Sequence, residues 1–318
     1  MNKYLVGRLA LIAPTVLAAS FLVFGVMRLI PGDIVLLILS GSGESVVSVE
    51  SRSVLEQELG LNKPLVIQYG DWLHSVLSGG FGGSSLESRD SIGSIIARQL
   101  PVTLLLSTYT IIACLLFSIP IGIISALNNR GCIGYLLDVV TLTGMAIPGF
   151  LVAISCLLGL ILVFKWSPPV VYSPILEDPL SHFRMLMLPV LILAWGHSSQ
   201  IARITRSSIL NSMKADYVVT ARSKGLSQFA ILSRHVAPNA LIPIITVFGL
   251  QFGSLLGGVI VIETIFGIPG IGRGIFHAVS VRDYPVVQTL ACVLVLMSLL
   301  VNLIIDATYR YLDPRIES

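Results

Sequence analysis

The sequence predicts an all-α integral membrane protein with six transmembrane helices. Of its 318 residues, 54% are hydrophobic and 12% are charged, and the mean hydropathy is +0.89. This composition is too apolar for a soluble globular protein. A membrane hydrocarbon layer about 30 Å thick requires a helix of roughly 20 apolar residues. The uncharged runs that meet this requirement lie at residues 9–27, 102–127, 139–164, 185–202, 236–262 and 284–305.

The charge and the cysteines exclude other classes of protein. A net charge of +3 is too small to indicate a nucleic-acid partner, so none is predicted. Three of the four cysteines fall inside apolar runs, which indicates no disulfide framework. The first run is longer than the apolar core of a signal peptide, and no small-residue cleavage site follows it. We therefore expect it to remain as the first transmembrane helix.

The positions of lysine and arginine predict the orientation in the membrane, because short cytoplasmic loops are enriched in these residues. The segment between the fourth and fifth runs carries six of them: Arg203, Arg206, Lys214, Arg222, Lys224 and Arg234. Both termini and this segment are therefore expected in the cytoplasm. The predicted parts are an N-terminal transmembrane helix at 1–30, an external segment at 31–100, and a five-helix core at 101–318. The core contains the cytoplasmic loop at 203–238.

The external segment is expected to contain a helix at 64–77, followed by a glycine-rich loop at 79–85. This loop lacks the lysine followed by serine or threonine that a Walker-type phosphate loop requires. No such motif occurs elsewhere in the chain, so neither ATP binding nor catalysis by this chain is predicted. The loop at 165–184 is rich in proline and is expected to be extended. Residues 265–283, rich in proline and glycine, predict a tight re-entrant or interfacial turn.

A few polar residues fall within or at the ends of the apolar runs. Gln251 lies near the middle of the fifth run, and Ser199 and Gln200 lie at the end of the fourth. These three are candidates for a translocation path, with hydrogen bonding between helices as the alternative. The same alternatives apply to His197, for which a hydrogen-bonded role is favoured over metal binding or proton transfer. The five histidines form no ligand motif, so no metal site and no catalytic residue are predicted.

The polar segment at 217–238 separates the fourth and fifth apolar runs. Ala221 and Gly225 stand four residues apart, so on a helix they would share one face on which another protein could approach closely. Gly225 is expected to break or bend this helix, and Pro238 to begin the next apolar run. The alternative interpretation is a basic loop that is simply held in the cytoplasm by its charge.

The motifs of the chain resemble those of one family along almost its entire length. Thr220-Ala-Arg-Ser-Lys-Gly225, with Pro238 thirteen residues after the glycine, is similar to the EAA loop of ABC-importer permeases. The further motifs begin at Arg28 (RLIPGD), Leu59 (LGLNKP), Gln99 (QLPVT), Phe266 (FGIPGIG), Arg282 (RDYP) and Leu312 (LDPR). The chain thus resembles the inner-membrane permease subunits of binding-protein-dependent importers for dipeptides, oligopeptides and nickel. The usual Glu-Ala-Ala opening is replaced here by Val219-Thr-Ala.

The resemblance implies a type I ABC-importer permease fold in a bacterial or archaeal plasma membrane. It also implies three kinds of protein partner: a second homologous permease, two cytoplasmic ATPases that bind ATP, and an extracytoplasmic substrate-binding protein. Lipid surrounds the helices, and the chain itself needs no cofactor. The residues implied to contact the ATPases are Tyr217, Thr220, Ala221, Arg222, Lys224, Gly225, Leu226 and Pro238.

The class of transported solute is left open by the resemblance. Di- or oligopeptides are expected, and nickel or glutathione are alternatives within the same class of permease. A secondary transporter is disfavoured, because ionisable residues near the middle of the membrane mark such proteins. In this chain every charged residue, including Glu263 after the fifth run, is expected at or beyond the end of a span.

Overall fold

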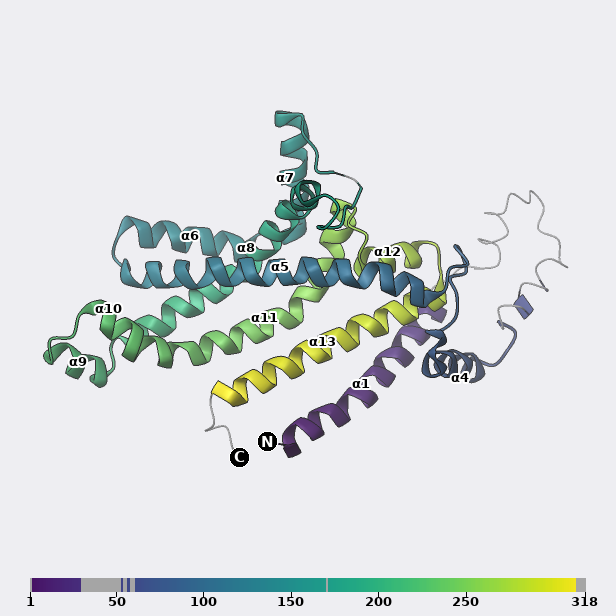
Figure 1. Ribbon diagram of the computed structural model, residues 1–318, viewed down its shortest axis with the longest axis horizontal. Helices are drawn as coiled ribbons and strands as arrows, with labels where there is room; N and C mark the ends of the chain where they lie inside the picture. The colour runs from purple at the N-terminus through teal and green to yellow at the C-terminus, as the bar shows by residue number, and fades with distance from the viewer. Residues whose placement is uncertain (1, 30–52, 54–55, 58–60, 170, 313–318) are drawn as a thin grey trace. The chain divides into compact units, whose positions relative to one another are not determined.

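The computed structural model describes residues 2–29, 53, 56–57, 61–169 and 171–312 (Figure 1). Within these residues the regular structure is helical, and the β-structure consists of one isolated bridge between Ser84 and Ser91. The predicted all-α class is therefore confirmed. The chain divides into two units: unit 1 comprises Met1–Thr103 and Pro269–Leu299, and unit 2 comprises Leu104–Ile268 and Leu300–Ser318.

Four described helices are long and apolar enough to cross a membrane by themselves. They are α1 (Asn2–Leu29), α5 (Ile92–Leu127), α8 (Pro179–Ser212) and α13 (Tyr284–Leu312). Three further pairs of helices qualify only when each bent pair is counted as one span, which gives a total of up to seven. The number of six therefore stays a prediction.

The third apolar run is not one continuous helix, and that prediction was wrong. It is divided between α6 (Cys132–Ala146) and α7 (Gly149–Phe164), whose axes differ by 103°. The break falls at Ile147 and Pro148. Proline has no N–H to donate and disfavours helical backbone at the residue before it. Ile147 accordingly has extended backbone angles, with φ −93° and ψ 123°.

The helix of the fourth run begins earlier than predicted. The preceding loop is not extended throughout, because the N–H groups of Glu177 and Asp178 donate to Pro174 O in a turn. The loop ends at Asp178, and α8 starts at Pro179 and continues for 34 residues. Asp178 caps this helix by accepting a 3.1 Å hydrogen bond from the Ser181 N–H, and proline is favourable at the first helical position. The hydrogen bonds from Ser181 hold the pKa of Asp178 below its usual value.

The predicted helix of the external segment is confirmed as α4 (Leu65–Ser75), and within unit 1 it packs against α1. The Tyr69 hydroxyl lies 2.8 Å from Ser20 Oγ, and its ring meets the ring of Phe24 edge-on at 5.5 Å. Trp72 Nε1 donates to Thr289 Oγ1 of α13 over 3.3 Å. The aromatic residues of this segment thus attach α4 to both α1 and α13.

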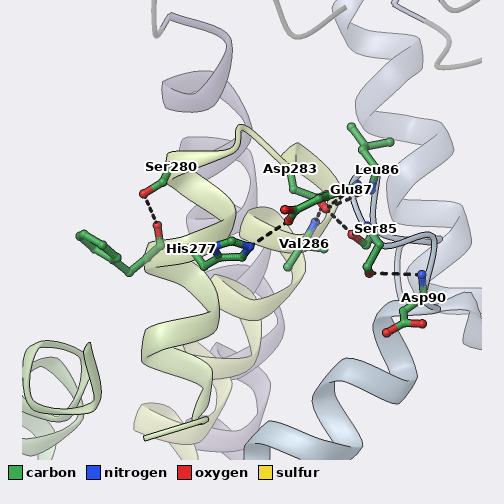
Figure 2. A network of polar contacts seen from close by, with 10 residues as sticks. Ser85, Leu86, Glu87, Asp90, His277, Ser280, Asp283 and Val286 are labelled. Carbon is green, nitrogen blue, oxygen red and sulfur yellow. Dashed lines mark hydrogen bonds and ion pairs between the residues drawn. The ribbon is translucent and has the colours of Figure 1, made fainter. Parts of the chain in front are cut away.

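The loop after α4 is held by the buried carboxylate of Asp283, which is 3% exposed. Figure 2 shows this carboxylate facing Ser85 and Leu86. Its Oδ2 accepts from Ser85 Oγ at 2.5 Å and from the Leu86 N–H at 3.0 Å. Glu87 in the same loop contacts His277 of α12 (Ile271–Ser280) through a 2.9 Å hydrogen bond.

The segment at 265–283 contains a ten-residue helix, α12, where a tight turn alone was predicted. The N-terminus of α12 packs on the start of α5 in unit 1. Thr103 Oγ1 accepts a 2.8 Å hydrogen bond from the buried Ile271 N–H, which has no partner inside its own helix. Gln99, one turn before Thr103, packs on Gly274, where any side chain would collide with the Gln99 amide. The motifs at 99–103 and 266–272 are thus in contact.

Candidate coupling hairpin and intramembrane polar cluster

The polar segment between the fourth and fifth runs folds as a short helical hairpin in unit 2. It consists of α9 (Asp216–Ser223), α10 (Gln228–Ile231) and the π-helical turn η2 (Leu232–Val236), and it leads into α11 (Ala237–Phe266). Figure 1 shows α9 and α10 next to each other at the start of α11. The predicted start of the next helix near Pro238 is confirmed.

Gly225 ends α9, as predicted, because it adopts a left-handed backbone with φ +77°. Its N–H donates to Arg222 O at 3.0 Å, and the Leu226 N–H donates to Ala221 O at 3.3 Å. This pair of bonds is the Schellman arrangement, in which glycine is favoured at the left-handed position. Ser227 then begins α10, where its Oγ accepts from the Ala230 N–H at 3.3 Å.

The predicted common face of Ala221 and Gly225 is not formed, so this prediction was wrong. Gly225 lies beyond the end of α9, whereas Ala221 is inside the helix and 5% exposed. Ala221 belongs to a buried cluster that includes Val218 of the same helix, Ile231 and Val236. The apolar spacing of Val218 and Ala221 turns this side of α9 towards the chain's own core.

Outside this buried face, the hairpin exposes apolar and basic side chains. We call the following four residues the outer patch: Tyr217 (41% exposed), Val219 (59%), Leu226 (38%) and Phe229 (79%). The exposed residues Thr220, Arg222, Lys224 and Pro238 are in the same segment. Sequence reasoning did not single out Phe229, although an aromatic residue in a polar segment was a visible signal. An exposed apolar surface outside a core is typical of a protein contact.

The second candidate site is a polar cluster between α8 and α11. Gln251 Oε1 accepts from His197 Nδ1 at 3.0 Å, and Gln251 Nε2 donates to Gln200 Oε1. The expected hydrogen-bonded role of His197 is thus confirmed. All three residues line a cavity of about 440 Å³, together with apolar residues from α7, α8 and α11. The structure therefore brings together two of the three candidate path residues.

The third candidate, Ser199, lies apart from this cluster. It is 2% exposed, and its hydroxyl donates to the Trp195 carbonyl oxygen at 2.7 Å within α8. It packs on Gly144 of α6, where a side chain would collide with the Ser199 hydroxyl. Ser199 thus serves the contact between α6 and α8.

Glu263 lies in the last turn of α11, in keeping with its expected place at the end of the fifth span. Its side chain is completely buried in the protein, which the sequence did not indicate. The described residues contain no cluster of three or more His, Cys, Asp or Glu side chains that could hold a metal ion.

Comparison with solved structures shows which known proteins share this fold. The chain matches a subunit in inward-facing structures of the MetNI methionine ABC transporter with a TM-score of 0.55. That match has 15% identity and covers 69% of this chain and 96% of that one. It also matches a chain of an amino acid ABC transporter with a TM-score of 0.53 and 17% identity, covering 76% of this chain and 98% of that one. The chain therefore shares its fold with chains of two solved ABC transporters.

Comparison of sequences identifies the family. Residues 118–318 match the family described as the binding-protein-dependent transport system inner membrane component, and the chain belongs to this family. A Brucella suis protein named as a peptide transport system permease is 37% identical over 316 residues, 99% of each chain. The oligopeptide transport system permease protein AppB of Bacillus subtilis is 33% identical over 322 residues, 100% of each chain.

Proposed function

We propose that this chain is a permease subunit of an ATP-driven importer of di- or oligopeptides and forms half of its translocation path. The observation that carries the proposal is the full-length similarity, at 33–37% identity, to proteins named as peptide transport permeases. A second homologous permease, two cytoplasmic ATPases and an extracytoplasmic binding protein complete the importer. The chain itself hydrolyses no ATP, and the outer patch of the α9–α10 hairpin is the surface on which an ATPase docks.

Peptides are favoured over nickel or glutathione by the chemistry of the polar cluster. Among the described residues that line its cavity there is no Asp, Glu, Lys or Arg, and the polar groups are two amides and one imidazole. Amides offer a donor and an acceptor that match a peptide backbone. A nickel ion would find only one nitrogen ligand there, and glutathione would bring a net negative charge without a cationic partner in this lining, whereas a dipeptide with neutral side chains has no net charge.

The proposed orientation places both termini and the hairpin in the cytoplasm. Cys132 is exposed at the start of α6 and is expected on the cytoplasmic side. Ser88 is exposed in the external loop, unlike the buried Ser85, so Ser88→Cys is the better external probe. In intact cells an impermeant thiol reagent should label Ser88→Cys and leave Cys132 unlabelled. Labelling of Cys132 without permeabilisation would contradict the orientation.

The function is tested with the complete importer reconstituted in liposomes that contain ATP. We expect uptake of a labelled dipeptide such as Ala-Ala, dependent on both ATP and the binding protein. Labelled Ni²⁺ and glutathione serve as the comparison solutes. Uptake of either one in place of the dipeptide would refute the peptide assignment, and dipeptide uptake without ATP would favour a secondary transporter.

A further inference from the structure

The helix α4 belongs to the segment expected outside the membrane, yet its side chains reach far along the transmembrane helix α1. The Tyr69 hydroxyl lies 2.8 Å from Ser20 Oγ and donates to the Leu17 carbonyl oxygen at 3.4 Å. The Tyr69 ring meets the rings of Phe21 and Phe24 edge-on at 5.6 Å and 5.5 Å. Ser20 is only 2% exposed, so Tyr69 is packed closely against α1.

The place of Ser20 along α1 gives the depth of this contact. The uncharged run of α1 is followed by Arg28, eight residues after Ser20. At a rise of about 1.5 Å per residue, Ser20 lies roughly 12 Å from Arg28 along the helix axis. Because the hydrocarbon layer is about 30 Å thick and the span Gly7–Leu29 has 23 residues, Ser20 falls inside the hydrocarbon. The Tyr69 hydroxyl finds no bulk water at this depth, which explains its hydrogen bonding to α1.

A contact with α13 places α4 at a similar level. Trp72 Nε1 donates to Thr289 Oγ1 at 3.3 Å, and Thr289 Oγ1 donates to the Phe81 carbonyl oxygen at 3.1 Å. Thr289 is the sixth residue of the span that begins at Tyr284, roughly 7–8 Å along the helix from that residue. α4 has 11 residues and is roughly 16 Å long, too short to cross the membrane. It therefore lies beside the outer turns of α1 and α13.

One face of α4 presents apolar side chains that the chain leaves exposed. Val66, Leu73 and Leu77 follow at intervals of seven and four residues, which places them on one face of a helix. We call these three residues the α4 stripe. Leu77 belongs to the π-helical turn η1 (Val76–Gly80), which continues α4 directly. Val66 is 83% exposed and Leu77 is 78% exposed.

The other side of α4 is polar and faces the ends of the transmembrane helices. Asp71 and Ser75 lie opposite the α4 stripe and line a cavity of about 250 Å³ together with Arg28 and Tyr284, which stand at the outer ends of their spans. Asp71 also forms an exposed ion pair with Lys63 at 2.6 Å. The α4 stripe is therefore directed away from these ends and towards the bilayer centre.

We propose that α4 lies within one leaflet of the membrane and that the α4 stripe contacts lipid acyl chains. The leaflet is the one at the Leu29 end of α1, the outer leaflet in the proposed orientation. A polar side near the headgroups and an apolar side in the acyl chains are typical of interfacial amphipathic helices. Tyr69 and Trp72 are of the residue types that favour this zone. Lipid fits better than a protein surface, because α1, on which α4 packs, has only 11% of its most apolar stretch buried.

The test measures the surroundings of single nitroxide labels by electron paramagnetic resonance. The chain is purified with its partner subunits and reconstituted in phosphatidylcholine liposomes. Each label is attached to one introduced cysteine in a Cys132→Ser background, which removes the exposed native cysteine. Molecular oxygen concentrates among acyl chains, whereas a nickel chelate stays in water, and power saturation reports the collisions of the label with each. The background without an introduced cysteine gives the blank.

Labels at Val66→Cys and Leu77→Cys should collide with oxygen and lose collisions with the nickel chelate. The matched control is Asp71→Cys, on the opposite side of the same helix, whose label should collide with the chelate. The ion pair that this control removes is exposed, so its loss should hardly affect folding. The ratio of oxygen to chelate collisions should therefore be several-fold higher at the α4 stripe than at the control.

Three results would overturn the inference. Chelate collisions at either label of the α4 stripe as frequent as at Asp71→Cys would show that α4 lies in water. Shielding of either label from both reagents would show that a protein surface, of a partner subunit or of another part of this chain, covers the α4 stripe. Shielding of the Asp71→Cys label from the chelate would contradict a polar side at the headgroups. None of these results depends on the transported solute, so each leaves the proposed function intact.

Discussion

Phe229 lies at the start of α10 with 79% of its surface exposed, and its replacement tests whether the outer patch binds an ATPase. Complete burial of a phenylalanine side chain is worth about 1.5–3 kcal/mol. Because about a fifth of Phe229 is buried within the chain, Phe229→Ala should lower the free energy of unfolding by only about 0.3–0.6 kcal/mol. An aromatic hot spot at a protein interface contributes about 2 kcal/mol or more. The effect on binding should therefore exceed the effect on folding.

A loss of about 2 kcal/mol corresponds to roughly 30-fold weaker binding. The measurement is the affinity of the purified ATPases for the detergent-solubilised permease pair, with dipeptide uptake measured in parallel. Phe164→Ala provides the matched control. Phe164 is 72% exposed at the end of α7, which the proposed orientation places outside the cell. This control should leave ATPase affinity unchanged.

Two outcomes would refute the reasoning. If Phe229→Ala binds the ATPases within about threefold of the wild type, the outer patch is not the docking surface. If it instead lowers the free energy of unfolding by as much as a core substitution, about 3 kcal/mol or more, then Phe229 packs inside the protein. Loss of affinity in Phe164→Ala as well would show that the assay reports a general effect of surface aromatic residues.

Three further predictions concern packing and hydrogen bonding, each measured on the purified chain. Ala221→Trp should overpack the buried cluster and destabilise by about 1–3 kcal/mol in thermal unfolding, and an unchanged melting temperature would contradict the burial of Ala221. Gly225→Ala should cost about 1–2 kcal/mol through its left-handed backbone alone, since no atom approaches the added methyl group; an unchanged melting temperature would contradict that backbone. Thr103→Val should speed hydrogen exchange at the Ile271 amide by roughly 5- to 150-fold, as expected from about 1–3 kcal/mol for its lost acceptor. Unchanged exchange would show that another group accepts from this amide.

The sequence predicted the helices well, because the length and hydropathy of an apolar run directly reflect the membrane thickness. It failed at Pro148, where the chain bends by 103° between α6 and α7. Proline within a membrane helix is tolerated when neighbouring groups satisfy the freed backbone atoms, so its presence alone does not distinguish a kink from a break. The extended backbone of Ile147 shows that the helix is broken here, and the hydropathy of the sequence does not indicate this break.

The orientation of α9 could have been predicted, whereas the polar cluster could not. Val218 and Ala221 stand three residues apart, which is the spacing of one apolar helix face, and this face is buried. A face shared by Ala221 and Gly225 was inconsistent with the helix end that the same glycine was expected to produce. By contrast, the contact of His197 with Gln251 depends on how α8 and α11 are aligned. No local pattern in either helix specifies that alignment.

The polar cluster between α8 and α11 carries no formal charge in the described lining of its cavity, which bears on the solutes that it can accept. The cavity beside Gln200 and Gln251 has a neutral, hydrogen-bonded lining, which costs less to place among membrane helices than a charge does. A neutral lining can accept the common backbone of peptides whose side chains differ in charge. We therefore expect the cluster of amides to discriminate little between peptides with charged and with neutral side chains.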